Sequence, residues 1–509
     1  FTEMAWTKTR RRRFPTLRQM HAEQPMVSLH LPICKEPPEL VIQTLDSLAA
    51  LDYPNFEVLV IDNNTNDESL WRPVADHCER LGVRFRFFTL GTYPGYKAGA
   101  LNFALGQTNP AAKMIGVIDS DYFVRRDWLK SVVPYFSQSH IGFVQAPQDH
   151  REWQDDSFRE MCNWEYAGFF HIGMVNRNER DAIIQHGTMT LIRRSALEEV
   201  GGWSEWCICE DAELGLRLLK KGYESVYINE VFGRGLTPNT FSGYKGQRFR
   251  WVYGAVQILK RHWSSLLPWT NGKLSAGQRY HFLTGWMPWF ADALHLVFTM
   301  AALVWTLGLV LLPKYFDFPL AAFLLPTLAM FAFKIFHTVG LYRACVPCDV
   351  RQRWLAAVAG MSLTHVIARG VFKGLFTSST PFLRTPKAED KPALVQAFFM
   401  AREEVYLLSA LWLAAIAVGS AYGMNSFDAF LWQAVLIVQS FPYLAALYCA
   451  VINVLPGHRQ RVLLQPTRVP ADSATSSAAT NSSPAHVGTG NIATAACAPD
   501  GEFPPRKVA

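Results

Sequence analysis

Long apolar stretches in the second half are the feature that most limits how this chain of 509 residues can fold. Leu294–Leu312 and Ala429–Leu455 carry no formal charge, Phe318–Leu341 carries only Lys334, and Val405–Ala421 is shorter but equally apolar. A helix needs about 20 apolar residues to cross the hydrocarbon core of a bilayer. We therefore predict four membrane-spanning helices, two within residues 294–341 and two within residues 405–455.

Basic residues mark one side of these four helices. The opposite loops hold only Lys314, Asp317 and Asp428. Because Lys and Arg are enriched in cytoplasmic loops, we expect a protein of the cytoplasmic (inner) membrane, in contact with lipids, with both termini and the catalytic region in the cytoplasm. The residues on the basic side are Lys334, Arg343, Arg351, Arg353, Arg369, Lys373, Arg384, Lys387, Lys391, Arg402, Arg459, Arg461 and Arg468.

The remaining segments of the second half mix apolar and charged residues, or lack bulky apolar residues. Residues 278–293 and 351–376 are typical of helices lying in the membrane interface, although the second could also be a fifth, polar span. Residues 469–509 are rich in Ala, Ser, Thr and Pro, which predicts a disordered tail. At the other end, residues 1–25 form a basic juxtamembrane segment. Phe1–Trp6 resembles the end of an apolar helix, so we expect a helix upstream.

Charge and cysteine content argue against a nucleic-acid-binding protein and against a structural zinc site. The net charge of +7 is explained by the membrane-flanking loops, so we expect no nucleic-acid partner. The nine cysteines include two close pairs, Cys207 with Cys209 and Cys345 with Cys348. Neither pair has the second pair of ligands that a structural zinc site requires.

Residues 26–277 alternate short apolar runs with helical stretches, which predicts an α/β domain. Two of the expected strands are followed by acidic residues, Asp62 in one case and Asp119 with Asp121 in the other. Ligands bind at the carboxyl ends of strands in open parallel sheets, so we expect the site there. The expected strands are Val27–Leu31, Phe56–Ile61, Val83–Phe88, Met114–Ile118, Ile141–Gln145 and Ala182–Gln185, and the expected helices include Leu40–Leu51 and Ala212–Lys220.

The acidic residues suit two tasks. Asp119 and Asp121 are spaced so that they can share Mg²⁺ or Mn²⁺ with a diphosphate, because such ions take one or two carboxylates plus phosphate oxygens and water. Glu210 and Asp211 precede a helix, where the ionised form of an acid is stabilised, which suits a general base. Taken singly, strand-end aspartates are common in turns and acids before helices are common caps.

A third cluster of polar residues follows the acids. Gln247, Arg248, Arg250 and Trp251 bring two guanidinium groups and an indole together. Arginine can neutralise a leaving diphosphate, and tryptophan offers a flat apolar face to a sugar ring.

In this order, Asp62, Asp119-x-Asp121, Glu210-Asp211 and Gln247-x-x-Arg250-Trp251 resemble the D, DxD, (T)ED and QxxRW signature of processive family-2 glycosyltransferases, such as cellulose, curdlan, hyaluronan and chitin synthases. Tyr96–Asn102 is similar to the family's KAGxLN segment. The resemblance covers about residues 26–455 and implies a cytoplasmic GT-A (Rossmann-like) α/β domain followed by a helical membrane bundle with interfacial helices.

The resemblance also implies residue roles. Asp62, Asp119 and Lys97 would bind the uridine diphosphate part of a nucleotide-sugar, and Asp121 would ligate the metal. Asp211 would be the general base, next to Glu210. Gln247 and Arg250 would hold the diphosphate, and Trp251 would stack on the acceptor sugar.

Three further positions bear on processivity and specificity. Thr385 and Lys387 lie in residues 377–392, which resemble a gating loop over the nucleotide, with Arg384 in place of the usual Val; an ordinary basic loop is the alternative. Cys209 stands where the family usually has Thr. His186 stands where cellulose synthases commonly have Cys, so it could contact the acceptor or be a buried polar residue.

We therefore expect an inverting, processive β-glucosyltransferase that uses UDP-glucose, with β-1,3-glucan favoured, and passes the growing polysaccharide across the membrane. A β-1,4-glucan, a mannan, an amino-sugar polymer, a non-processive lipid glycosyltransferase and a transporter with a degenerate nucleotide domain are the alternatives. An accessory export subunit is left open, and the donor, the linkage and the choice of Mg²⁺ or Mn²⁺ are not fixed by the residues.

Overall fold

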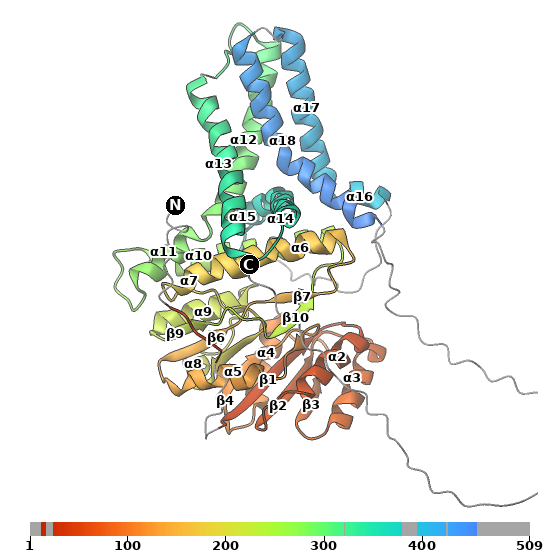
Figure 1. The fold of residues 1–509 in the computed structure, drawn as a ribbon, viewed down its shortest axis with the longest axis vertical. Coiled ribbons are helices and arrows are strands. Elements are labelled where there is room, and N and C mark those ends of the chain that lie inside the picture. Colours follow the sequence, from red (N-terminus) through yellow and green to blue (C-terminus); the bar gives the residue numbers. More distant parts are fainter. Residues whose placement is uncertain (1–11, 17–23, 320, 379–393, 424–425, 456–509) are drawn as a thin grey trace, which may run out of the picture.

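The computed structural model of the chain describes residues 12–16, 24–319, 321–378, 394–423 and 426–455. A mixed α/β domain occupies the lower part of the molecule, and long helices rise from it as a bundle (Figure 1). The α/β domain comes first in the sequence, as predicted.

A seven-stranded sheet forms the centre of the α/β domain. Strands β3, β2, β1 and β4 are parallel, β8 runs antiparallel to both of its neighbours, and β6 and β9 pair in parallel. The carboxyl ends of the first four strands therefore share one edge of the sheet. The strand order is β3 (Phe85–Thr89), β2 (Phe56–Asp62), β1 (Met26–Ile33), β4 (Ala112–Val117), β8 (Thr190–Arg193), β6 (Ile141–Gln145) and β9 (Glu224–Tyr227).

Helices and a small second sheet complete this domain. The second sheet consists of β5 (Phe123–Val124), β10 (Gly233–Leu236) and β7 (Asp149–Arg151). The helices are α2 (Pro38–Ala49), α3 (Glu68–Leu81), α4 (Tyr96–Gln107), α5 (Trp128–Val132), the 3₁₀ turn η1 (Val133–Ser137), α6 (Ser157–Gly168), the π-helix η2 (Phe169–Met174), α7 (Val175–Asn178), α8 (Arg194–Glu199) and α9 (Glu210–Lys221).

Apolar runs identified most strands because these strands are buried on both faces. Every residue of β2 is buried, and Ile141–Gln145 forms β6 with the predicted bounds. The prediction of a strand at Ala182–Gln185 was wrong. This run is apolar because it is a mostly buried loop, and the strand comes later, at Thr190–Arg193, where it pairs with β4 and β6.

The second half of the chain is helical. Within the described residues, five helical stretches are long and apolar enough to cross a membrane, judged by length and composition: Ala276–Leu311, Leu324–Cys345, Val350–Phe376, Arg402–Tyr422 and Phe427–Val454. The helices are α10 (Phe241–Leu266), α11 (Ala276–Thr284), α12 (Met287–Leu311), α13 (Ala321–Cys345), α14 (Val350–Ser362), α15 (Thr364–Phe376), α16 (Leu394–Met400), α17 (Arg402–Tyr422) and α18 (Phe427–Val454).

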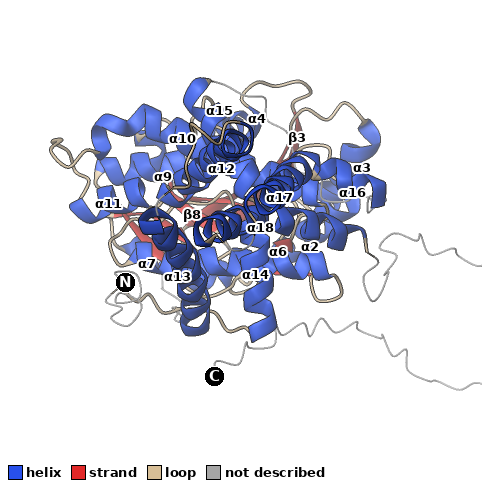
Figure 2. Ribbon diagram, turned by 90° about the horizontal axis from the view of Figure 1, so that it is seen from above, coloured by secondary structure: helices blue, strands red, loops and turns tan. Residues whose placement is uncertain are grey.

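The two predicted interfacial segments differ in shape. Residues 287–293 of the first belong to the long helix α12. The second is divided at Leu363 into α14 and α15, which are seen nearly end-on in Figure 1 at the base of the upright helices α12, α13, α17 and α18. Figure 2 shows the same helices from above. Val350–Phe376 is the additional stretch beyond the four predicted spans. Its placement at the membrane interface stays a prediction.

Helix α10 joins the α/β domain to the bundle. Gly370 and Gly374 of α15 face it so closely that a Cβ at these positions would lie 3.0 Å from Val252 and 2.8 Å from Val256. At the other end of α10, Lys245 pairs at 2.8 Å with Glu404 of α17, and Asn453 of α18 accepts from the Phe241 amide at 3.1 Å. The bundle and the α/β domain are therefore packed against each other along one shared helix.

Candidate active site

A pocket of about 660 Å³ lies at the carboxyl ends of the parallel strands. Residues after β1, β2 and β4 form one side of it, and the starts of α4 and α9 form the floor. α10, η2 and the beginning of α12 close the opposite side. Eight of the predicted site residues line this pocket: Lys97, Asp119, His186, Glu210, Asp211, Gln247, Arg250 and Trp251.

Lys97 is at the centre of the acidic part of the pocket. Its Nζ donates to Asp119 Oδ1 at 2.7 Å and to the Gly187 carbonyl at 3.0 Å. Burial lowers the pKa of Lys97, but the carboxylates of Asp119, Glu210 and Asp211 more than offset this effect and raise the pKa above its usual value. Lys97 is therefore a permanent cation, suited to binding an anionic ligand such as a diphosphate.

Gly187 allows the backbone to approach these charged groups. A Cβ at this position would lie 2.6 Å from Lys97 Nζ and 3.1 Å from Asp211 Oδ2. No larger residue fits without displacing one of the two side chains.

Glu210 and Asp211 begin α9, and Asp211 Oδ1 accepts from the Ala212 amide at 2.7 Å. Burial raises the pKa of both carboxyls. The neighbouring Asp211 charge raises the pKa of Glu210 further, and the Lys97 charge opposes the rise at both carboxyls. A carboxylate with a raised pKa is a stronger base than an exposed one, so the arrangement can take a proton from a hydroxyl.

Asp62 and Asp121 lie behind the pocket surface, each 1% exposed. Asp62 accepts hydrogen bonds from the hydroxyls of Thr65 at 2.5 Å and Thr89 at 3.3 Å. Asp121 Oδ2 accepts from the Leu236 amide at 2.9 Å. In the described part of the chain, no three His, Cys, Asp or Glu side chains are grouped so that they could hold a metal ion by themselves.

Helix α10 supplies the groups opposite the acids. Gln247 Oε1 accepts a hydrogen bond from the Tyr166 hydroxyl, and the Trp251 ring lies 5.8 Å from the Tyr166 ring. Arg248 also lines the pocket and pairs with Glu165 at 2.6 Å. Burial lowers the pKa of Arg250, which remains a cation at any physiological pH.

His186 lies among aromatic rings. Its ring centroid is 5.3 Å from those of both Phe169 and Phe170, and its amide donates to Gln145 Oε1 at 2.9 Å. Burial, with a smaller effect of Arg177, lowers the pKa of His186 to about 3. The imidazole is therefore neutral in the pocket, where it can form hydrogen bonds but carries no charge.

If Asp211 acts as a general base, the reaction rate should begin to fall at a higher pH than it would with an exposed carboxylate. Only the ionised form accepts a proton, and the raised pKa means that protonation begins at higher pH as the solution is acidified. We expect kcat, measured between about pH 4 and 9, to begin to fall at a pH above the usual carboxyl pKa of about 4. A rate that stays constant down to about pH 4 would contradict this.

Several residues of the pocket have no counterpart in the predicted site. Lys35, Asn64 and Tyr96 line it with φ angles of 51°, 65° and 51°, a strained conformation that is often found at functional sites. Trp286 and Trp289 line the end nearest to α12. Sequence reasoning assigned these two tryptophans to a membrane interface, and their aromatic character was the only available signal.

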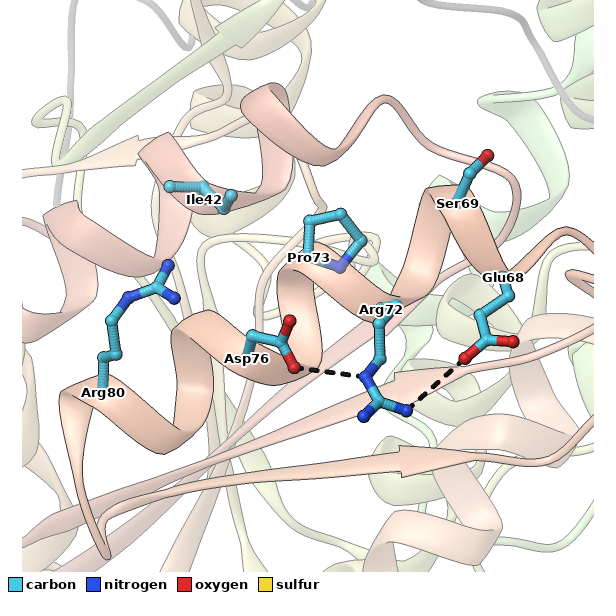
Figure 3. Close-up of a pocket in the computed structure, with 7 residues that line it drawn as sticks. All are labelled: Ile42, Glu68, Ser69, Arg72, Pro73, Asp76 and Arg80. Carbon is cyan, nitrogen blue, oxygen red and sulfur yellow. Dashed lines mark hydrogen bonds and ion pairs between the residues drawn. The ribbon is translucent and has the colours of Figure 1, made fainter.

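Two predicted substrate-binding residues, Thr385 and Lys387, lie outside the described residues. A second hollow, much more open, lies between α2 and α3, where Ile42, Arg72 and Arg80 are among its lining residues. Figure 3 shows that Arg72 is paired with Glu68 and Asp76 of its own helix, at 3.4 and 3.2 Å. These charges are satisfied within α3, so the hollow offers nothing comparable to the first pocket.

Comparison with protein families matches residues 25–254 to the family described as "Glycosyltransferase like family 2". Residues 25–254 are therefore similar to a glycosyltransferase family 2 domain. The matched residues include every predicted site residue except the two outside the described part. The prediction of a sugar-transferring enzyme is thereby supported.

Two curated relatives resemble the family 2 domain. One, named as a glucomannan 4-β-mannosyltransferase of Oryza sativa subsp. japonica, is 24% identical over 287 residues, which are 52% of this chain and 46% of the relative. The other, the cellulose synthase 1 catalytic subunit [UDP-forming] of Komagataeibacter xylinus, is 26% identical over 290 residues, 55% of this chain and 37% of the relative. The chain thus matches less than half the length of either.

A solved structure resembles the fold. A mannosyltransferase from Pyrobaculum calidifontis, in complex with GDP-mannose and Mn²⁺, superposes with a TM-score of 0.51 at 19% identity, covering 74% of this chain and 93% of that one. The predicted fold class is confirmed: a GT-A-like α/β domain is followed by a helical region with five candidate membrane-spanning helices.

Proposed function

We propose that the protein is an inverting, processive β-glucosyltransferase of the cytoplasmic membrane, which polymerises glucose from UDP-glucose and passes the chain across the bilayer. The observation that carries this proposal is that Lys97, Asp119, Asp211 and Arg250 line one pocket together with Trp251. The pocket extends to Trp286 and Trp289 at the start of α12, which favours delivery of the product to the membrane helices.

Each charged group has a part in the proposed transfer. Asp211 takes the proton of the acceptor hydroxyl while that oxygen forms a bond to the anomeric carbon of the donor. The bond between this carbon and the diphosphate oxygen breaks, and the nucleoside diphosphate leaves with the electron pair. Lys97 and Arg250 stabilise the charge on the leaving group, and Gln247 helps to hold it. Asp62 and Asp119 support the nucleotide, and Trp251 and His186 contact the acceptor.

Asp119 lines the pocket and Asp121 lies just behind its surface, which is compatible with a divalent ion whose coordination the substrate completes. Mg²⁺ and Mn²⁺ commonly bind through one or two carboxylates, with phosphate oxygens and water as further ligands, so a cage of three protein ligands is not required. Asp121 would hold the ion, with Asp119 beside it. When bound, such an ion neutralises charge on the diphosphate. The structural neighbour with Mn²⁺ and GDP-mannose supports the same proposal.

The proposed orientation in the membrane and the proposed processivity are inferred from the sequence. The basic loops favour a cytoplasmic family 2 domain. Thr385 and Lys387 would act in a gating loop over the nucleotide, as the resemblance implies. The β-1,3 linkage likewise rests on resemblance, and the relatives, a mannosyltransferase and a cellulose synthase, make a β-1,4-linked glucan or mannan the second candidate.

Product analysis separates these candidates. Membranes containing the protein are incubated with radiolabelled UDP-glucose or GDP-mannose, with Mg²⁺, Mn²⁺ or EDTA, and insoluble polymer is digested with β-1,3-glucanase, β-1,4-glucanase or β-mannanase. We expect metal-dependent polymer from UDP-glucose that only the β-1,3-glucanase releases. Label released only by the β-1,4-glucanase, or incorporated only from GDP-mannose, would refute the linkage or the donor. A single sugar added to lipid would refute processivity.

A further inference from the structure

One wall of the pocket is a single helix that changes its winding. α6 continues into the π-helix η2, and Phe169 and Phe170 at this junction line the pocket beside His186. One turn earlier, Tyr166 donates its hydroxyl hydrogen to Gln247 and packs against Trp251. The position of this helix therefore sets the groups that face the acids across the pocket.

The junction departs from regular α-helical pairing. The Phe169 amide donates to Tyr166 O, three residues back, whereas the α-helical partner would be Glu165 O. Tyr342 of α13 supplies a donor at this point. Its hydroxyl oxygen lies 3.1 Å from Trp164 O and 3.3 Å from Glu165 O. A tyrosine from a candidate membrane-spanning helix thus completes the pairing where the winding changes.

Tyr342 is buried and closely packed against α6. Tyr342 is 8% exposed and belongs to an apolar cluster with Trp164, Ala167 and Ile172. A Cβ at Gly168 would overlap the Tyr342 hydroxyl, so glycine is needed there for the two helices to meet. In such surroundings a carbonyl that loses its donor cannot turn to water, which makes the hydrogen bond costly to remove.

The same turn of helix holds α10. The Glu165 carboxylate accepts from Arg248 at 2.6 Å and from the Tyr244 hydroxyl at 2.9 Å. Glu165 is therefore held through its backbone by α13 and through its side chain by the helix that carries Gln247, Arg250 and Trp251. A displacement at Tyr342 would reach the pocket by two routes, along η2 and through α10.

We propose that Tyr342 is a positioning residue that fixes the α6–η2 wall from the membrane bundle and so sets the acceptor side of the transfer site. This inference rests on the proposed function for its effect on transfer, but its structural part does not. On the donor side, Lys97 and Asp119 lie on other elements, whereas Gln247 and Arg250 lie on α10, which Glu165 joins to this wall.

The test is Tyr342→Phe in the full chain, which removes only the hydroxyl. We expect kcat for polymer formation from UDP-glucose to fall about tenfold, because reacting groups tolerate little misplacement. The Kd for UDP-glucose should rise by a smaller factor than kcat falls, since Lys97 and Asp119 lie neither on this helix nor on α10. Hydrogen–deuterium exchange of peptides within residues 162–175 should become faster.

Matched variants separate positioning from general stability. Tyr422→Phe removes a similar hydrogen bond inside the bundle, where the hydroxyl donates to Leu309 O at 2.7 Å, and should leave kcat unchanged. Gly168→Ala should reproduce the Tyr342→Phe effects, whereas Gly173→Ala, whose Cβ would approach only Phe169 at 3.9 Å, should not.

Unchanged exchange within residues 162–175 in Tyr342→Phe would overturn the inference, with or without activity. So would faster exchange combined with an unchanged kcat, or an equal loss of kcat in Tyr422→Phe. If the wild type forms no polymer from UDP-glucose or GDP-mannose, the proposed function fails, and the exchange measurement alone decides whether Tyr342 holds this wall.

Discussion

Asp211→Asn should reduce sugar transfer by about a thousandfold and leave nucleotide binding nearly intact. The amide has almost the size of the carboxylate, so the start of α9 and its bond to the Ala212 amide are preserved. What is lost is the only form of this side chain that can accept the proton of the acceptor hydroxyl. Initial rates of label incorporation, with UDP-glucose affinity measured in parallel, test this.

Two variants sharpen the assignment of the base. Glu210→Gln should cost less than Asp211→Asn, because burial and the neighbouring Asp211 charge raise the pKa of Glu210 and favour its neutral form, which Gln resembles. Asp52→Asn, which changes an acid paired with Lys130 far from the pocket, should have no effect on transfer. An Asp211→Asn variant that keeps a tenth or more of the wild-type rate would remove Asp211 from the role of base.

Arg250→Ala should lower kcat by about 100- to 1000-fold, the loss expected when one group that stabilises developing charge is removed. Arg250 lines the same pocket as the acids, and burial strengthens its interaction with a leaving diphosphate. Binding of UDP should weaken as well, because the product carries the same diphosphate. Steady-state kinetics with UDP inhibition measure both quantities.

Arg261→Ala is the matched control for this variant. Arg261 belongs to the same helix, is exposed, and lies over the Trp206 ring at 5.3 Å. It should leave kcat and UDP binding unchanged. If Arg250→Ala and Arg261→Ala behave alike, or if Arg250→Ala alters neither quantity, Arg250 has no part in holding the diphosphate.

The sequence predicted the order of elements well where burial determines composition. β2 is buried throughout and β4 nearly so. Their runs of apolar residues therefore predicted that Asp62 and Asp119 lie at strand ends. It failed at Ala182–Gln185, because a buried loop and a buried strand have the same composition, and it missed Thr190–Arg193, which is short and contains polar residues. Only pairing with neighbouring strands distinguishes these cases.

The candidate site was predicted through residues that carry charge or stacking surfaces. Lys97, Asp211 and Arg250 line one pocket, as expected of groups that act on one substrate. The residues that support the pocket from behind, such as Glu165 and Tyr342, had no signal in the sequence. These two residues are 177 positions apart and become partners only when their helices meet. The left-handed backbone of Lys35 and Tyr96 was equally hidden, since neither residue type favours it.

The close approach of Gly370 and Gly374 to Val252 and Val256 has a practical consequence for anyone who wishes to study the transferase part in isolation. The family match ends at residue 254, in the middle of α10. A fragment that ends there would lose half of this helix, and the apolar surface that α15 covers would be exposed to solvent. Such a fragment is expected to aggregate in detergent-free buffer. The catalytic unit is better purified together with its membrane helices, in micelles or nanodiscs.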